Sequence, residues 1–231
     1  PKQYAKSARA RRLATALERS GSVTDAIYEA GYGSASRGYD AMGQTLGMRP
    51  VDYRKGAVGE TIRYAISTSG LGPIAVAGTT KGICAIEFGE GETELADRLA
   101  AKFPGAELAP TDAAFRQWLK TLLAFIETPA AGLDLPLDIQ GTAFQRRVWD
   151  ALRDIPAGTI VTYTELALRI GSPTSVRAVA HACASNRIAV AIPCHRVVRQ
   201  DGELAGYRWG IDRKRRLLER EKEAQTTRRK K

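Results

Sequence analysis

The sequence predicts an α+β protein with a helical first segment and a mainly helical last segment. Three observations support this prediction. Apolar residues recur at helical spacing near the N-terminus, strand-like runs alternate with glycine-rich turns in the middle, and amphipathic helices dominate the last third. A chain of 231 residues is long enough for two or three modest domains. We place the segments at residues 1–57, 58–138 and 139–225, followed by a basic tail at 226–231.

The composition argues against a membrane protein or a secreted one. The apolar fraction, 44%, is ordinary for a globular chain. No apolar run approaches the ~18 residues that a membrane span needs. The N-terminus is basic but lacks the apolar stretch of a signal peptide. We therefore expect a cytoplasmic protein with no membrane partner.

Cysteine and histidine are scarce. Cys84, Cys183 and Cys194 are too few and too scattered for a disulfide framework. They cannot build a zinc site by themselves, and the only histidines are His181 and His195. We expect reduced thiols, no structural metal and no cofactor.

Charge is distributed unevenly along the chain. The net charge is +5 over residues 1–57, −5 over 58–140 and +10 over 141–231. Basic segments attract polyanions, and DNA is the obvious candidate. A basic surface that serves only solubility is the alternative, and we favour nucleic acid over it.

The first segment predicts a helix-turn-helix. After a helix that ends at Gly21, Ser22 can cap a short helix that runs through Ala30. A turn containing Gly31 and Gly33 follows, and a second helix is predicted over 34–46. Such a pair can place its second helix in a DNA major groove, although many helical hairpins never touch DNA.

The middle segment predicts a small α+β unit. The stretch "TIRYAISTSGLGPIAVAGTTKGICAIEFGEG" indicates a hairpin or meander of strands. Amphipathic helices are predicted over 93–103 and 113–127. Cys84 lies in an apolar run, so we interpret it as a buried structural thiol.

The last segment predicts a second helix-turn-helix, formed by a short helix after "GTIVTY" and by the helix "TSVRAVAHACASN". Arg177 and His181 share one face of the latter at i, i+4, and small residues lie beside them: Ala178, Ala182 and Ser185. A face of small side chains can approach a groove closely, but it can equally be an alanine-rich packing face. A final helix is predicted over 212–225.

The stretch "AVAIPCHRVVRQDG" predicts a buried strand that ends in a cysteine and a histidine. A neighbouring base lowers the pKa of a cysteine and makes it a nucleophile. Successive side chains of a strand point to opposite faces, but Pro193 favours a turn in which Cys194 and His195 converge. A core thiol next to a surface histidine is an equally weighted alternative.

One carboxylate of the final helix lies on its apolar face. With about 100° per residue, Glu221 falls within about 10° of the centre of the stripe set by Leu217 and Leu218, whereas Glu219 and Glu223 fall on the far side. A buried carboxylate needs a partner, and a histidine base needs an orienting carboxylate. A pair of Glu221 with His195, a pair with an arginine, and an exposed helix end all stay open.

Six motifs occur in order with plausible spacing: "GTAFQRRVWDAL", "VTYTELA", "SVRAVAHACASN", "IPCHRVV", "GYRWG" and "LLEREKE". Over roughly residues 60–223 the chain resembles the methylated-DNA–protein-cysteine methyltransferases, or O6-alkylguanine-DNA alkyltransferases. Residues 3–57 resemble half of an AraC-type DNA-binding domain, and the combination is similar to Ada-type adaptive-response regulators. The resemblance implies a ribonuclease H-like α/β subdomain, then a winged-helix-like alkyltransferase domain.

The resemblance also implies a reaction. An alkyl group would pass once, directly, from O6-alkylguanine (less well from O4-alkylthymine) in double-stranded DNA to the thiolate of Cys194. His195 would act through a water as the base, and Glu221 would orient it. Asn186 would hold the turn before the active-site strand. A monomer of the bacterial cytoplasm or nucleoid is implied.

Further roles follow from the resemblance. Tyr163 would donate to the guanine and help to turn the nucleotide out of the stack. Arg177 would enter the duplex as a finger. The remaining implied contacts are Arg37, Ala178 and His181 with DNA, and Val197, Val198, Tyr207 and Arg208 around the guanine.

The chain departs from the Ada pattern in its first segment. The zinc domain and the first half of the AraC-type unit are not in this sequence, which we expect to be a fragment or a degenerate fusion. The predicted helix over 34–46 holds one basic residue, Arg37. Three functions stay open: a single-turnover repair alkyltransferase, an Ada-like transcriptional regulator and a Cys–His thiol hydrolase.

Overall fold

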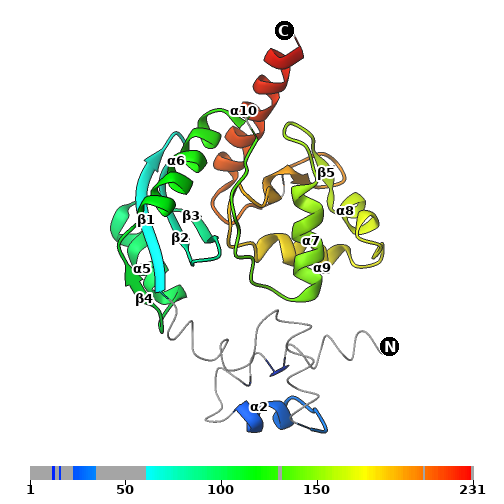
Figure 1. Ribbon diagram of the computed structural model, residues 1–231. Coiled ribbons are helices and arrows are strands. Elements are labelled where there is room, and N and C mark those ends of the chain that lie inside the picture. Colours follow the sequence, from blue (N-terminus) through cyan, green and yellow to red (C-terminus); the bar gives the residue numbers. More distant parts are fainter. Residues whose placement is uncertain are drawn as a thin grey trace.

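The structure is a computed structural model that describes residues 12, 13, 16, 23–34, 61–129, 132–204 and 206–229, with side chains to residue 226. From residue 61 onward two units lie side by side, a sheet with its helices and a mainly helical unit (Figure 1). The predicted α+β class is therefore confirmed. The predicted helix over 34–46, with Arg37, lies outside the described residues apart from Ser34.

The described part of the first segment contains the short helix predicted after Ser22. Helix α2 spans Val23–Glu29 and buries Ala26 and Ile27 against Leu13. Gly31 ends it with a φ of 85°, a conformation that suits glycine at a helix C-terminus.

The middle segment forms a four-stranded sheet of order β3-β2-β1-β4. Strands β1 (Thr61–Ser69), β2 (Gly72–Gly78) and β3 (Ile83–Phe88) form the predicted antiparallel meander, with Ile66 opposite Ala75 and Val76 opposite Ile86. The short β4 (Glu107–Ala109) adds in parallel to β1.

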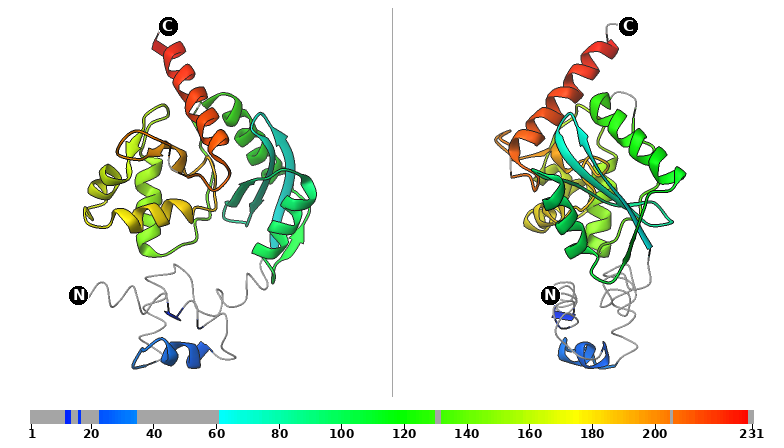
Figure 2. Two further views of the ribbon diagram at one scale, coloured as in Figure 1. Left: turned by 180° about the vertical axis from the view of Figure 1, so that it is seen from behind. Right: turned by 90° about the vertical axis from the view of Figure 1, so that its left-hand side faces the viewer.

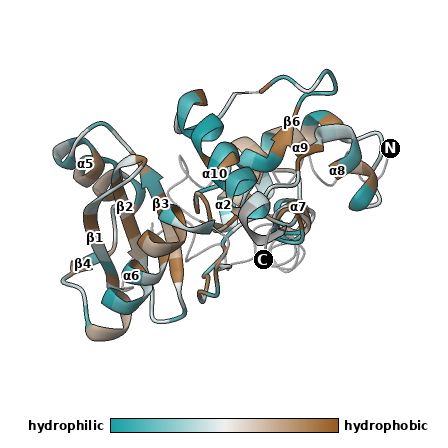
Figure 3. Ribbon diagram, turned by 90° about the horizontal axis from the view of Figure 1, so that it is seen from above, coloured by the Kyte–Doolittle hydropathy of each residue, from teal (hydrophilic) through white to brown (hydrophobic). Residues whose placement is uncertain are grey.

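The two faces of this sheet bury different partners, because side chains alternate along a strand. Ala75, Ala77 and Ala85 share a cluster with Leu95 and Leu99 of α5 (Glu92–Lys102). The opposite face, with Ile74, Val76 and Ile86, contributes to a larger cluster with α6 (Ala113–Glu127) and the second unit. The sheet is correspondingly apolar along β2 and β3 (Figure 3).

The second unit contains α7 (Ala143–Arg153), α8 (Tyr163–Arg169) and α9 (Val176–Ala184). Thr142 and Thr162 open α7 and α8 with capping boxes, which satisfy backbone N–H groups at the helix starts. A two-stranded parallel sheet joins β5 (Val161–Thr162) to β6 (Val197–Val198).

The two units share one core. Ile86 N donates to Arg187 O at 2.9 Å, and Ala189 N donates to Ile86 O at 3.1 Å, so the segment after α9 continues the edge of the sheet at β3. The apolar cluster of the β2–β3 face extends from Phe88 to Trp149 of α7 and Leu217 of the last helix. In Figure 2 that last helix starts between the two units, and its C-terminal end extends beyond them.

The predicted strand before Cys194 is wrong. Ile188 makes only an isolated bridge, residues 189–192 form turns, and Cys194–Arg196 form a 3-10 helix. Val190 has a φ of 68°, which no regular strand accommodates. Apolar content signalled burial correctly, but it could not distinguish a buried turn from a buried strand.

The predicted end of the last helix at 225 is also wrong, because helix α10 spans Ile211–Arg229. No glycine or proline stops it there, and Thr226 Oγ1 donates to the Lys222 carbonyl at 3.0 Å. Although α10 has 19 residues, it is strongly charged, and none of the helices in the described ranges is long and apolar enough to cross a membrane.

Phe115 tests the packing of α6 on the sheet. Its side chain is fully buried in the larger cluster. We expect Phe115→Ala to lower the free energy of unfolding by about 3–5 kcal/mol, because it leaves a cavity. Leu108→Ala, at a residue 37% exposed on β4, should cost only about 0.5 kcal/mol. Equal effects in urea unfolding would contradict this description of the core.

Candidate active site

Asn186 organises the turn that leads to Cys194. Its Nδ2 donates to Ile192 O at 2.8 Å and lies 3.2 Å from Cys194 Sγ, while its Oδ1 accepts from Ile188 N at 2.9 Å. The side chain is buried, so each of these bonds replaces a bond to water. The predicted holding of this turn by Asn186 matches these contacts, although the turn precedes a 3-10 helix rather than a strand.

Val190 stores strain inside this turn. A β-branched residue with a φ of 68° costs on the order of 1–3 kcal/mol and persists only where the surroundings enforce it. The bonds of Asn186 to Ile188 and Ile192 close the chain on either side of Val190. The side chain of Asn186 therefore fixes the turn, and the turn in turn sets the position of Cys194, which follows it.

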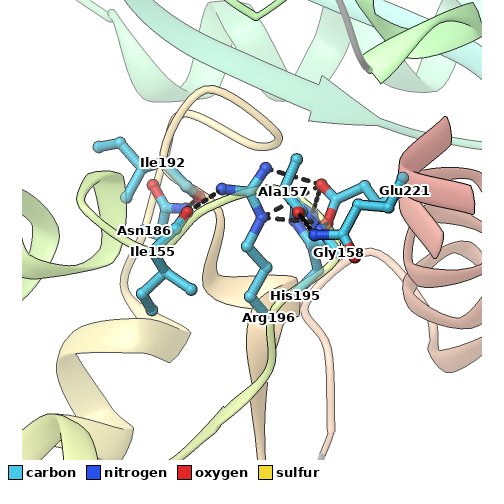
Figure 4. Close-up of polar contacts among 9 residues, drawn as sticks. Ile155, Ala157, Gly158, Asn186, Ile192, His195, Arg196 and Glu221 are labelled. Atoms are coloured by element: carbon cyan, nitrogen blue, oxygen red, sulfur yellow. Dashed lines mark hydrogen bonds and ion pairs between the residues drawn. The ribbon is translucent and has the colours of Figure 1, made fainter. Parts of the chain in front are cut away.

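Glu221 of α10 lies at the centre of a buried polar cluster (Figure 4). Its Oε1 lies 2.9 Å from His195 Nε2 and 2.7 Å from Arg196 Nη2, and its Oε2 accepts from Gly158 N at 2.9 Å. Arg196 Nε adds contacts of 3.1 Å to both oxygens. The two pairings left open from the sequence, with His195 and with an arginine, therefore both occur.

These contacts fix the charge states of the pair. Burial alone would raise the pKa of Glu221, but the hydrogen bonds and charges of His195 and Arg196 outweigh it and lower the pKa to about 2. Burial lowers the pKa of His195, against the opposing pull of Glu221. An ionised carboxylate can only accept, so neutral His195 carries its proton on Nε2. Nδ1, which has no hydrogen-bond partner among the described residues, is then the basic nitrogen.

Cys194 is a protonated thiol at rest. It is 6% exposed, and burial raises its pKa, while the hydrogen bond from Asn186 and the charge of Lys214 act in the opposite direction. Lys214 is itself fully buried on α10 and donates from Nζ to Val197 O at 2.6 Å. The site thus holds a thiol, a neutral imidazole and groups that favour a thiolate when a proton is removed.

Four of the predicted site residues lie around this cluster. Tyr163 is the first residue of α8, is half-buried, and has its pKa raised to about 12, chiefly by burial and then by the neighbouring thiols. The ring of Tyr207 meets His195 edge to face, with centroids 6.5 Å apart. Val197 and Val198 are buried in β6 directly after Arg196.

Arg208 lies at the border between the units. Its guanidinium is half-exposed, and Nη2 lies 3.9 Å from Oε1 of the buried Glu87 in β3. Glu87 also pairs with Lys102 of α5. The loop before α10 therefore faces the sheet as well as His195.

Helix α9 presents Arg177, Ala178 and His181 to solvent, so of the two alternatives left open for this face, packing does not apply to these three residues. The prediction placed Ala182 on the same face, and this is wrong: Ala182 is buried, and its carbonyl accepts from Trp149 Nε1 at 2.9 Å. Ala184 is exposed instead. Cys183 packs in the core, and Cys84 is likewise buried, as its interpretation as a structural thiol requires.

Sequence reasoning missed three residues of the site: Arg196, Gly158 and Lys214. Lys214 was detectable, because the helical-face arithmetic that selected Glu221 places Lys214 on the same stripe. Arg196 gave no signal beyond its position after His195. Gly158 contributes only its backbone N–H, with a φ of 75°, and no side-chain pattern reveals that.

The fold and this cluster together define a class of protein. It has two units, and a buried cysteine follows the second helix of a helix-turn-helix in the chain and lies beside a histidine–glutamate pair. Residues 62–139 match the family model "6-O-methylguanine DNA methyltransferase, ribonuclease-like domain" and residues 143–223 match its "DNA binding domain".

Known proteins agree with these matches. The chain is 40% identical over 158 residues to a methylated-DNA–protein-cysteine methyltransferase of Methanosarcina barkeri, covering 68% of this chain and 96% of that protein. It is 47% identical over 223 residues to the "bifunctional transcriptional activator/DNA repair enzyme Ada" of Escherichia coli, covering 96% of this chain but only 63% of that longer protein. The crystal structure of Mycobacterium tuberculosis OGT in complex with DNA matches with a TM-score of 0.58 and 36% identity, over 71% of this chain and 94% of that one. The chain belongs to the 6-O-methylguanine DNA methyltransferase family.

The contribution of Glu221 to stability should depend on pH. Its pKa is lower in the folded protein than in the unfolded chain, so its contribution is complete above about pH 4.5 and is lost as the pH falls towards 2. At pH 7, Glu221→Gln should cost about 3–5 kcal/mol, because Arg196 loses its buried partner. Denaturant unfolding across this pH range measures the difference.

The matched control is Glu219→Gln, on the exposed side of the same helix. It should unfold like the parent protein at every pH. A difference between parent and Glu221→Gln that stays constant from pH 7 to 2 would contradict the assignment of an ionised Glu221.

Proposed function

We propose that this protein repairs DNA by transferring the alkyl group of O6-alkylguanine, and less well of O4-alkylthymine, directly to Cys194 in a single turnover. The observation that carries the proposal is the buried thiol beside the pair formed by His195 and Glu221. Family membership adds support, because relatives named for this activity align with the chain over nearly their whole length. Neither a metal nor a cofactor enters the proposed reaction.

The first step produces the thiolate. His195 Nδ1 takes the proton of Cys194 through a bridging water, and the imidazolium that forms lies against the carboxylate of Glu221. Arg196 holds that carboxylate ionised and in place, and Asn186 and Lys214 stabilise the charge on sulfur. The pair works because Glu221 both fixes the tautomer of His195 and balances its charge.

The second step transfers the alkyl group. The Cys194 Sγ–carbon bond forms while the bond between that carbon and guanine O6 breaks. The electron pair of the broken bond stays with the guanine, to which Tyr163 donates a hydrogen bond. The proton that His195 took from Cys194 returns through water to the guanine, so His195 ends neutral. The pKa of Tyr163, raised to about 12, keeps its hydroxyl protonated and able to donate. The thioether is stable, so the acceptor is consumed.

The substrate guanine must leave the duplex before this chemistry, which costs a few kcal/mol of stacking and pairing. We propose that α9 enters the DNA groove with its exposed face, that Arg177 fills the vacated space, and that Ala178 and His181 lie against the backbone. Tyr207 and Arg208, with Val197 and Val198, would form the guanine pocket. The complex of the Mycobacterium tuberculosis relative with DNA supports DNA as the partner. We propose that the substrate is double-stranded and that the protein acts as a monomer.

The segments 58–138 and 139–225 are the proposed functional division, and the limits of the two family models support it. A second function, Ada-like regulation of transcription, is favoured by one observation: the likeness to Ada continues across 96% of this chain and so into the first segment. We propose that residues 1–57 are half of an AraC-type unit. Measuring whether the full 231-residue chain binds a promoter duplex sequence-specifically would test the proposed role of residues 1–57.

Mass spectrometry tests the transfer. After incubation with duplex DNA containing O6-methylguanine, we expect one added methyl group on the peptide that contains Cys194, in proportion to the lesion and without turnover. Cys194→Ala should lose transfer and keep DNA binding. The matched control, Cys183→Ala, removes the neighbouring core thiol and should still transfer. An intact lesion with unmodified Cys194 would refute the proposal, and multiple turnovers would indicate a hydrolase instead.

Arg177 should matter only when a base must be flipped. We expect Arg177→Ala to slow transfer from duplex DNA on the order of tenfold or more, because nothing then replaces the extruded base. Transfer from free O6-benzylguanine should be unchanged. Arg116→Ala, an exposed arginine on α6, is the control. Equal slowing on both substrates would contradict the role of Arg177 as a finger.

A further inference from the structure

Arg213, near the start of α10, joins three segments that are far apart in the sequence. Its Nε donates to Leu71 O at 3.0 Å in the turn between β1 and β2, and its Nη2 donates to Gly89 O at 2.8 Å at the end of β3. Its Nη1 donates to Trp209 O at 3.0 Å. The guanidinium also lies over the ring of Phe88, 5.8 Å from its centroid.

These bonds use the geometry that distinguishes arginine from lysine. The guanidinium is a rigid planar fork, so fixing two carbonyls of the sheet unit also fixes where the third carbonyl, that of Trp209, must lie. The side chain is only 17% exposed, so water competes little for these positions. Arg213 thereby sets the loop before α10 relative to the sheet.

The segment that Arg213 fixes carries contacts of the active site. Trp209 is buried and packs against Tyr207, with ring centroids 5.1 Å apart, and Tyr207 in turn meets His195. On the other side, Lys214 follows Arg213 directly and donates to Val197 O. Arg213 thus contacts the segments that carry both the ring of Tyr207, which packs on His195, and the ammonium group of Lys214, which favours the thiolate of Cys194.

We propose that Arg213 is a positioning residue for the transfer reaction: it uses the sheet unit as a frame to hold Tyr207 against His195 and Lys214 near Cys194. This inference rests on the proposed function for its kinetic consequence, but not for its effect on the thiol. None of the hydrogen bonds or ion pairs of Arg213 to the described residues reaches α9, so Arg213 should act on the chemistry and leave DNA binding intact.

Two other arginines of α10 separate positioning from general attachment. Arg216 contacts Gly70 O, and Arg220 donates to Ile126 O at 2.8 Å and to Gly70 O at 3.1 Å. Both attach α10 to the sheet unit, and neither has a hydrogen bond to the described part of the loop before α10. Arg216 contacts the same β1–β2 turn as Arg213, which makes it the matched control.

The experiment compares Arg213→Ala with Arg216→Ala in the full chain. The first measurement is the rate at which iodoacetamide alkylates Cys194 between pH 6 and 10, followed by mass spectrometry of the Cys194 peptide. We expect Arg213→Ala to move this profile to higher pH, because Lys214 no longer lies where it favours the thiolate, and Arg216→Ala to leave it unchanged.

The second measurement is transfer from free O6-benzylguanine. We expect Arg213→Ala to lower the rate on the order of ten- to a hundredfold, since small displacements of reacting groups cost this much, while affinity for undamaged duplex stays constant. Arg213→Lys, which keeps the charge but not the fork, should fold like the parent and show an intermediate loss.

A parental pH profile and rate in Arg213→Ala, or equal losses in Arg213→Ala and Arg216→Ala, would overturn the proposal. Should the parent protein fail to transfer alkyl groups at all, the proposed function fails, yet the iodoacetamide profile still decides the role of Arg213.

Discussion

The buried carboxylate of Glu221 is the interaction on which the site depends. A charge that is 1% exposed is tolerated only if donors surround it, and here they come from His195, Arg196 and the backbone of Gly158. His195 and Arg196 belong to the 3-10 helix, and Gly158 belongs to the loop before β5. Hydrogen bonding of this one carboxylate therefore holds α10, the 3-10 helix and that loop together. The loop before β5 leads directly to Tyr163. The contacts that stabilise the buried charge of Glu221 are therefore the same contacts that assemble the site.

The sheet unit contributes no group to the proposed chemistry, but it defines where the reacting groups lie. It is joined to the second unit through the bonds between Ile86 and the segment after α9, and through the arginines of α10. These attachments fall at both ends of the path from Asn186 to Glu221. A rigid frame that contacts both ends limits how far the thiol and its base can move apart. The packing of the sheet is consistent with such a frame. One of its faces contributes to the apolar cluster that also contains Cys194, and its other face is covered by α5.

Periodicity and capping residues were enough to predict most described helices, the meander and the face of α10 that bears Glu221, because those features are local in sequence. The turn at 186–192 was not predictable in that way. Its shape depends on bonds of Asn186 to residues two and six positions away, and these force Val190 into a conformation that its own preference opposes. Likewise, Arg196 and Gly158 become partners of Glu221 only once the chain is folded. The resemblance to a family supplied the proposed roles of Tyr163 and Arg177, which no local pattern indicated, and it favoured the nucleophile over the core thiol as the interpretation of Cys194.

The resting state of Cys194 fits a thiol that is used once. In a protein consumed by a single transfer, as proposed here, every oxidised or wrongly alkylated cysteine removes one molecule from service. Thiolates rather than thiols undergo these side reactions. Burial keeps the pKa of Cys194 raised and the adjacent His195 neutral, so the pair carries no separated charge until a proton moves. Glu221 and Lys214 meanwhile hold the charges that favour ionisation in fixed positions. The same burial that protects the thiol therefore also strengthens the electrostatic support that activates it, because both effects grow as water is excluded.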